Sequence, residues 1–136
     1  MSDAISNKHL DWLEAESIYI IREVIAEAKN PALLFSGGKD SVVLLALACK
    51  AFSYGERKLQ LPFKLLHVDT GHNYQEVIDF RDQTVERLGV ELVVGHVEDS
   101  IKKGTVVLRS ELDSRNAAQA VTLLEAIEDN EFDALM

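Results

Sequence analysis

The fold is decided by Ser36-Gly37-Gly38-Lys39-Asp40-Ser41, a glycine-rich stretch between an apolar run and a series of helix-forming residues. The apolar run covers residues 32–35 after Asn30-Pro31, and the helix formers begin at Val42. This pattern predicts a strand, a tight loop and a helix. Two adjacent glycines let the backbone turn sharply and let a ligand approach the main chain.

The start of the following helix is a natural anion site, because its first N–H groups are unpaired and carry the positive end of the helix dipole. Phosphate is the usual ligand of such a site. Lys39 adds a mobile cation, Ser36 and Ser41 add hydroxyl donors, and Asp40 stands where its carboxylate can cap the first turn. The alternative is a plain glycine turn with a solvated lysine, but six consecutive residues in this context favour phosphate binding.

Two better-known phosphate loops are excluded by spacing. A Walker A loop needs a glycine where this chain has Leu33, and Ser or Thr where it has Asp40. The Gly-x-Gly-x-x-Gly fingerprint of dinucleotide-binding folds is absent as well.

The composition is that of an ordinary soluble protein, with 27% charged and 47% hydrophobic residues in 136, enough for a single domain over 1–136. The net charge of −9 argues against a nucleic-acid or membrane-surface partner. Cys49, in an apolar helical segment, is expected to be a buried thiol. One cysteine and no secretory or membrane-spanning segment predict a cytoplasmic location.

Hydrophobic periodicity predicts an α/β fold: an open parallel sheet with right-handed crossovers and helices on both faces. Residues 97–113 give only a weak indication of secondary structure. We expect a turn at Lys102-Lys103-Gly104 and a short strand or packed loop after it. We also expect Trp12 and Tyr19 to be packing residues rather than platforms for a ligand. The expected helices are 8–29, 40–52, 74–88 and one that starts after Asp113 or Ser114, and the expected strands are 32–35, 63–68, 91–95 and 132–136.

The second expected strand ends in Asp69-Thr70-Gly71, and ligands of open α/β sheets gather at the carboxyl ends of strands. Asp69 is therefore expected beside the phosphate loop, within reach of a ribose hydroxyl, an adenine amino group or Mg²⁺. The plainer interpretation is an Asx turn. A metal triad of His67, Asp69 and His72 is rejected, because His67 lies within the strand.

Three further residues are weaker candidates for the substrate side of the site. Arg81 lies in Phe80-Arg81-Asp82, where a surface ion pair is the simpler interpretation. Arg115 and Asn116 fall in the first turn of the last helix, near the expected site, where capping and solvation explain them equally well.

The loop resembles the PP-loop of ATP pyrophosphatases, and the chain as a whole resembles the small subunits of bacterial sulfate adenylyltransferases. The resemblance runs through nearly the whole chain, apart from residues 97–116. The segments that carry it are Leu13-Glu14-Ala15-Glu16-Ser17, Ile20-Ile21-Arg22-Glu23-Val24, Asn30-Pro31, the loop, Lys50-Ala51-Phe52, Leu61-Pro62-Phe63, Leu65-Leu66-His67-Val68-Asp69-Thr70-Gly71, Phe80-Arg81-Asp82 and Phe132-Asp133-Ala134.

The resemblance implies a reaction in which ATP and sulfate give adenylyl sulfate and pyrophosphate, with Mg²⁺ as cofactor and a GTPase subunit as partner. It implies that Asp40 shapes the loop or approaches the metal, and that Asp69 contacts the nucleoside or the metal. Lys39 and Asp40 are the catalytic candidates. The residues implied to hold the leaving pyrophosphate are Ser36, Gly37, Gly38, Lys39 and Ser41.

Two alternatives stay open: another PP-loop enzyme, such as a phosphoadenylyl sulfate reductase, an amidotransferase or a tRNA-thiolating enzyme, and a non-catalytic nucleotide-binding module. The reductase depends on a cysteine close to its C-terminus, which this sequence does not show. Residues 132–136 look like a core strand with nothing to cover it, and the resembling subunits continue beyond it. We therefore expect an N-terminal portion of a longer subunit, inactive alone, with Leu135 and Met136 partly uncovered.

Overall fold

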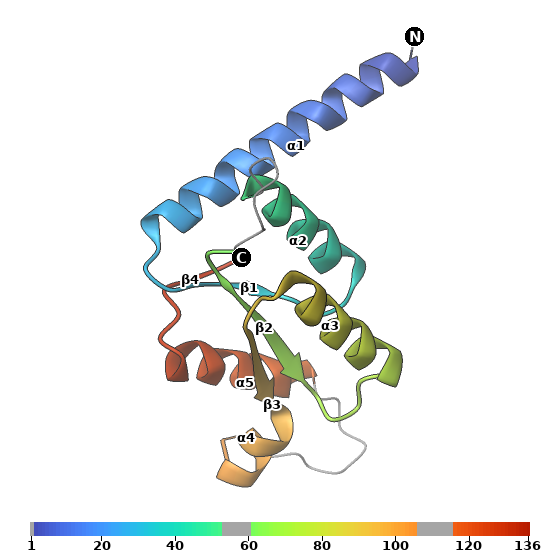
Figure 1. The fold of residues 1–136 in the computed structure, drawn as a ribbon. Coiled ribbons are helices and arrows are strands. Elements are labelled where there is room, and N and C mark those ends of the chain that lie inside the picture. The colour runs from blue at the N-terminus through green and yellow to red at the C-terminus, as the bar shows by residue number, and fades with distance from the viewer. Residues whose placement is uncertain (1, 53–60, 106–115) are drawn as a thin grey trace.

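The structure is a computed structural model that describes residues 2–52, 61–105 and 116–136 of the 136-residue chain. Strands and helices alternate along the chain after a long N-terminal helix (Figure 1). The elements are α1 (Ser2–Glu27), β1 (Pro31–Leu34), α2 (Lys39–Ala51), β2 (Lys64–Asp69), α3 (Gln75–Leu88), β3 (Leu92–His96), α4 (Val97–Lys103), α5 (Asn116–Asp129) and β4 (Ala134–Leu135).

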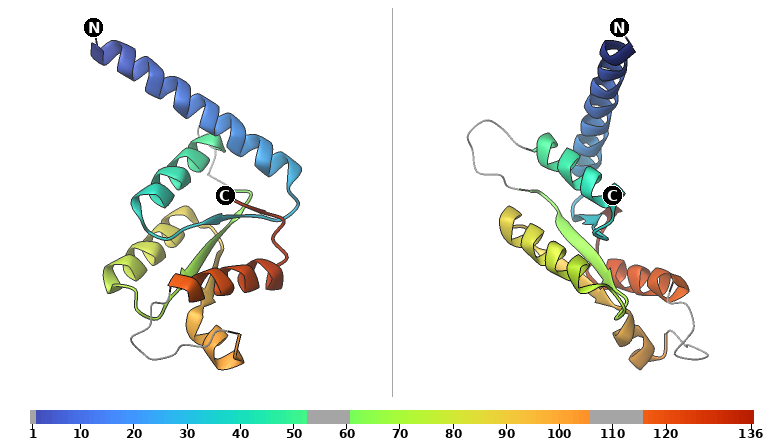
Figure 2. Two further views of the ribbon diagram at one scale, coloured as in Figure 1. Left: turned by 180° about the vertical axis from the view of Figure 1, so that it is seen from behind. Right: turned by 90° about the vertical axis from the view of Figure 1, so that its right-hand side faces the viewer.

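The four strands form one parallel sheet in the order β3-β2-β1-β4. The pairs β1–β2 and β2–β3 are each joined by one crossover helix, α2 and α3, as the alternating sequence pattern predicts, and β4 returns to pair with β1. Figure 2 shows helices on both sides of the sheet, so the predicted α/β fold is confirmed.

Alternate side chains of the central strands build two separate cores. On one face, Leu33 and Leu65 are fully buried against α1, α2 and α3. On the other, Ala32 and Leu66 pack against Ala126 of α5. Strands buried on both faces need an almost continuous apolar sequence, and that is the signal by which they were predicted.

Helix α1 differs from its prediction at its N-terminal end. It begins at Ser2 rather than at residue 8, and its first half extends away from the sheet (Figure 1). Trp12 and Tyr19 are 59% and 60% exposed, so they lie at the surface rather than acting as the packing residues that were expected. Only the second half of the helix reaches the core, where Ile21 is buried.

The segment after β3 is also corrected, because Val97–Lys103 is a helix rather than an irregular link. Its first turn carries Glu98 and Asp99, its last turn carries lysines, and Gly104 ends it with a φ of 79°. These are ordinary helix-end signals, but seven residues are too few to show a helical period. The expected strand after Thr105 and the capping residues Asp113 and Ser114 lie outside the described residues.

A carboxylate ties the last strand to the first. Asp133 precedes β4, and its two oxygens accept hydrogen bonds from the backbone N–H groups of Lys29 (2.7 Å) and Asn30 (2.8 Å). These bonds lower the pKa of Asp133 below the ordinary aspartate value. Leu135 is 37% exposed, as expected, and Met136 is half-buried, with one side packed against the core on the α1–α3 face.

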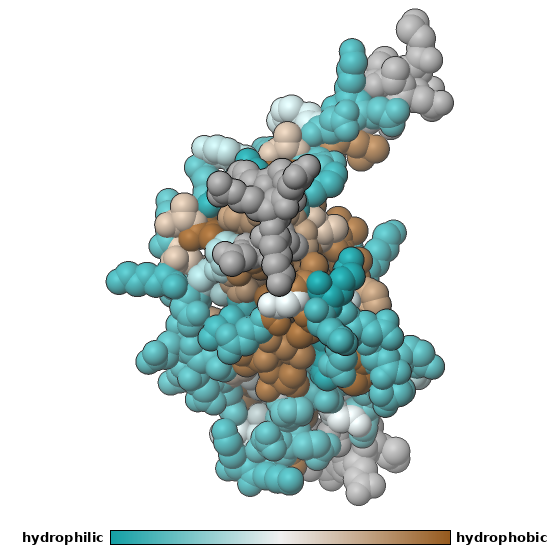
Figure 3. Space-filling model, in the orientation of Figure 1, coloured by the Kyte–Doolittle hydropathy of each residue, from teal (hydrophilic) through white to brown (hydrophobic). Residues whose placement is uncertain are grey.

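The surface of the domain is mixed rather than uniformly polar. Figure 3 shows hydrophobic side chains gathered near the middle of one face, surrounded by hydrophilic ones. Within the described residues, none of the helices is long and apolar enough to cross a membrane.

Candidate functional site

The phosphate loop and the Asp69 turn lie at the same edge of the sheet. Strands β1 and β2 are parallel neighbours, with Leu34 opposite Leu66. The loop leaves the carboxyl end of β1, and Asp69 ends β2. The predicted juxtaposition is therefore confirmed at the level of the sheet edge.

The loop is held by hydrogen bonds among its own residues. The hydroxyl of Ser36 accepts from the Gly38 N–H (3.2 Å) and donates to the Ser41 hydroxyl (3.2 Å). The Ser41 hydroxyl in turn donates to the Gly38 carbonyl (2.9 Å). The two serines thus shape the loop itself.

Helix α2 starts directly at this loop, with Gly38 as its N-cap and no side chain capping it in the described structure. The expectation that Asp40 caps the helix is wrong, because α2 already begins at Lys39 and Asp40 lies within its first turn. The uncapped N–H groups and the helix dipole are available to an anion. Lys39 is exposed beside them.

Gly37 adopts a φ of 81°, a region that side chains with a Cβ disfavour. A Cβ at this position would lie 3.0 Å from Cγ1 of Val77 on α3. The glycine is therefore needed both for the turn and for the close packing of α3 against the loop.

The turn after β2 is built by side chains. Asp69 Oδ1 accepts from the Gly71 N–H (2.8 Å), which is the Asx turn that we weighed as the plainer interpretation. Asn73 Oδ1 accepts from both the N–H and the hydroxyl of Thr70 (2.9 Å each). The second Asp69 oxygen lies 3.8 Å from Nδ1 of His96. One carboxylate oxygen is thus committed to the turn, and the other is placed at the sheet edge.

A cavity of about 330 Å³ opens next to the loop, between this edge and α5. Its apolar walls come from β1, β2 and α5, and its polar lining comes from the loop, the Thr70 turn and α5. A cavity of this size is at the lower end of the range that small-molecule ligands occupy. The lining residues are Leu34, Ser36, His67, Val68, Thr70, Asn73, Gln119, Ala120 and Leu123.

Sequence reasoning missed most of this cavity. Gln119 and Leu123 look like ordinary helix residues, and only the packing of α5 against β1 and β2 brings them to the loop. Asn73 carried a weak signal, because it follows the Asp69-Thr70-Gly71 motif by two residues.

Arg81 lies on the α3 face that packs beneath the loop. Its side chain is 12% exposed, and its Nη2 lies 2.9 Å from Oδ1 of Asp82. The ion pair was anticipated at the surface, and its Asp82 side is indeed exposed (59%), whereas the arginine stem is largely covered. Nη1 has no hydrogen-bond partner in the part of the chain that the structure describes.

The remaining two candidates are not tested by these contacts. Arg115 lies outside the described residues, and only the backbone of Asn116, the first residue of α5, is described.

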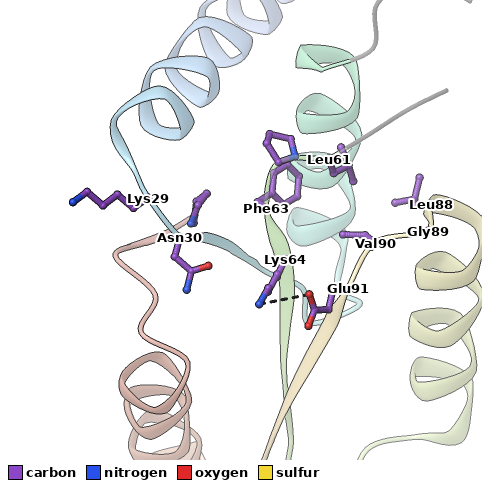
Figure 4. Close-up of a pocket in the computed structure, with 11 residues that line it drawn as sticks. Lys29, Asn30, Leu61, Phe63, Lys64, Leu88, Gly89, Val90 and Glu91 are labelled. Carbon is purple, nitrogen blue, oxygen red and sulfur yellow. Dashed lines mark ion pairs between the residues drawn. The ribbon is translucent and has the colours of Figure 1, made fainter. Parts of the chain in front are cut away.

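A larger hollow of about 580 Å³ lies at the opposite edge of the sheet, where the strands begin (Figure 4). Lys64 and Glu91 form an ion pair of 3.5 Å there. None of the predicted site residues lines this hollow, and loops at the amino ends of parallel strands are not where ligands of this fold class bind.

The chain matches a known protein family and is similar to curated relatives. Residues 30–136 match the family model of the phosphoadenosine phosphosulfate reductase domain. Over 126 residues the chain is 57% identical to sulfate adenylyltransferase subunit 2 from Mycobacterium tuberculosis and 56% identical to that from Mycolicibacterium gilvum. These alignments cover 93% of this chain and 39% of each relative, so the chain spans well under half the length of the curated relatives it matches.

Two solved structures share the fold at low sequence identity. An NH3-dependent NAD synthetase from Campylobacter jejuni aligns with a TM-score of 0.62 at 14% identity, over 88% of this chain and 50% of that one. The U34-tRNA thiolase NcsA from Methanococcus maripaludis aligns with a TM-score of 0.55 at 20% identity, over 89% and 43% of the two chains.

Proposed function

The chain belongs to the phosphoadenosine phosphosulfate reductase domain family, and from that premise we propose that it is the ATP-binding domain of a sulfate adenylyltransferase small subunit. The proposed reaction transfers the adenylyl group of ATP to sulfate and releases pyrophosphate. The mycobacterial relatives carry this activity in their names. The fold neighbours support only the fold.

One observation carries the ATP-binding proposal: the phosphate loop and the 330 Å³ cavity adjoin at one sheet edge and share Ser36. A nucleoside triphosphate needs such a pair of sites, one for an anionic tail and one for a flat, mostly apolar ring. The α2 N-terminus and Lys39 suit the phosphates. The walls formed by Leu34, Val68 and Leu123 suit the adenosine.

The proposed chemistry needs positioning and charge stabilisation rather than a covalent intermediate. A sulfate oxygen attacks the α-phosphorus, and the bond to the leaving pyrophosphate breaks. Lys39 and the first N–H groups of α2 stabilise the charge that develops on the pyrophosphate. Asp40, in the first turn of α2, shapes this end of the loop.

A magnesium ion suits the Asp69 oxygen that does not hold the turn, the one beside His96, because Mg²⁺ is commonly held by one or two carboxylates together with substrate phosphates. The ion, when bound, would share the negative charge of the triphosphate. Among the described residues, no three His, Cys, Asp or Glu side chains group as a metal site, so the phosphates themselves would supply most of the ligands.

We further propose a cytoplasmic enzyme that works with a second, GTP-hydrolysing subunit. Support for a partner is the designation "subunit 2" of the relatives. The net charge of −9 fits a basic surface on that partner.

The decisive experiment is sulfate-dependent exchange of labelled pyrophosphate into ATP, measured beside a direct ATP titration. The full-length Mycobacterium tuberculosis relative serves as the positive control, with and without a GTPase subunit. We expect this chain to bind ATP and to support exchange only when the rest of the enzyme is supplied. Absence of ATP binding overturns the proposal, and binding with no exchange in the reconstituted enzyme leaves only a nucleotide-binding module.

A further inference from the structure

A buried histidine meets the main chain at the point where the phosphate loop leaves β1. Phe35 follows β1 directly, and its N–H still donates to the Leu66 carbonyl of β2 (2.8 Å). The carbonyl of Phe35 is paired differently, with Nδ1 of His67 at 2.8 Å. His67 belongs to β2 and is only 1% exposed. At the end of the β1–β2 pairing, the imidazole of His67 is thus the hydrogen-bond partner of the Phe35 carbonyl, in place of a backbone N–H group.

The partner fixes the protonation state of the ring. A carbonyl oxygen can only accept, so Nδ1 must carry the proton and donate. Burial, the largest influence, lowers the pKa of His67, which keeps the ring neutral near pH 7. In that state Nε2 is a bare acceptor, and it is buried with no hydrogen-bond partner in the described part of the chain.

Helix α3 holds the same short segment from its own side. The ring of Phe80 stacks on that of Phe35, with centroids 6.0 Å apart. Val77 packs against Gly37 so closely that a Cβ there would lie 3.0 Å from it. The residues on either side of Ser36 are therefore both fixed by elements remote in sequence.

This arrangement is costly if it serves packing alone. A buried polar atom with no partner costs about 1–3 kcal/mol, and a leucine would fill a similar volume without that cost. His67 lies between the apolar core that contains Leu65 and the 330 Å³ cavity that Ser36 also lines, so apolar packing alone does not account for it. The imidazole is therefore better explained by its bond to the loop than by the core around it.

We propose that His67 is a positioning residue for the phosphate loop. Its Nδ1–H bond sets the direction in which the chain leaves β1, and so sets where the N–H groups that follow Ser36 point. Within the part of the chain that the structure describes, the other side-chain hydrogen bonds of the loop run between its own residues and cannot fix it relative to the sheet. This inference rests on the proposed function, because the aligned N–H groups are those that would bind the triphosphate.

Three variants separate positioning from packing. His67→Asn keeps an N–H donor at about the place of Nδ1, His67→Gln moves the amide towards the place of Nε2, and His67→Leu fills the space with no donor. ATP affinity is measured by calorimetry, and stability by urea denaturation. We expect His67→Leu to weaken ATP binding about tenfold, the worth of one hydrogen bond, and His67→Asn to restore most of it.

A packing role would show a different order, with His67→Leu binding ATP as well as the wild type or His67→Asn no better than His67→Leu. Either result overturns the inference. If the wild type itself binds no ATP, the proposed function fails first. Should His67→Leu not fold, ¹⁵N NMR of the wild-type ring decides: a proton on Nε2 with a bare Nδ1 removes the bond and the inference, and the reverse supports it.

Discussion

Replacing Gly37 with alanine should damage the phosphate loop in two ways that can be measured separately. The residue has a φ of 81°, where an alanine costs roughly 1–2 kcal/mol. The new Cβ would also lie 3.0 Å from Cγ1 of Val77, tighter than nine in ten such contacts, so Val77 or the loop must give by a few tenths of an ångström. Overpacking of this kind costs about 1–3 kcal/mol. The free energy of unfolding should therefore fall by about 2–5 kcal/mol.

Gly104 provides the matched control. Its φ of 79° is nearly the same, but a Cβ there would meet nothing within 4 Å. Gly104→Ala should lose only the backbone term of about 1–2 kcal/mol and should leave ATP affinity unchanged. Gly37→Ala should lose more stability and should also weaken ATP binding, because the displaced residue is part of the loop.

Urea denaturation and ATP titration of both variants test this reasoning. Val77→Ala, alone and combined with Gly37→Ala, completes a double-mutant cycle that isolates the contact. The combined variant should be more stable than the sum of the single losses predicts. Equal losses of stability in Gly37→Ala and Gly104→Ala, with no coupling to Val77, would refute the argument.

Three other outcomes follow from single side chains. Lys39→Ala should weaken ATP binding by about 1.5–3 kcal/mol without lowering the melting temperature. Lys102→Ala, which removes an exposed lysine elsewhere, should leave ATP affinity unchanged. Unchanged affinity in Lys39→Ala would remove Lys39 from the site. Burial lowers the pKa of His67, so the free energy of unfolding should fall as pH drops below about 6.5. The fall should be at most about 1.4 kcal/mol per pH unit and should stop once the folded pKa is passed. His67→Asn, which carries no titrating group, should remove this slope. The backbone N–H groups of Lys29 and Asn30 lower the pKa of Asp133, so its contribution to stability is present above about pH 3.9 and is lost as pH falls through the folded pKa. In Asp133→Asn, the free energy of unfolding should therefore depend less on pH in that acid range. An unchanged dependence on pH would contradict this.

The parallel sheet could be predicted because its signals are local. Each central strand is a short apolar run, and each run is followed by glycine or turn residues and then by a helical pattern. The helix expected over residues 74–88 ends there, with Gly89 in the left-handed conformation at its C-cap. Where the local signal was short or ambiguous, as in the seven residues of α4, the prediction failed.

Helix α1 shows that hydrophobic periodicity predicts a helix but not which of its residues are buried. Its apolar residues follow a helical period, so burial along its whole length was a reasonable expectation. Burial, however, depends on what lies opposite, and the described domain offers α1 only α2 and the sheet next to its second half. Leu10, like Trp12 and Tyr19, is left more than half exposed. Periodicity predicted the helix correctly but not its neighbours.

The two ends of the proposed ligand differ in how the sequence encodes them. Phosphates are bound mainly by backbone N–H groups and one lysine, so six consecutive residues suffice to predict the site, whatever surrounds them. A nucleoside needs walls, and here Leu34, Val68 and Leu123 come from three elements that meet only in the folded sheet. His67 belongs to the same non-local class, since its bond to Phe35 spans 32 positions. A motif can therefore indicate that a chain binds a phosphate. Which nucleoside fits, and in which direction the N–H groups of the loop point, are decided by the fold.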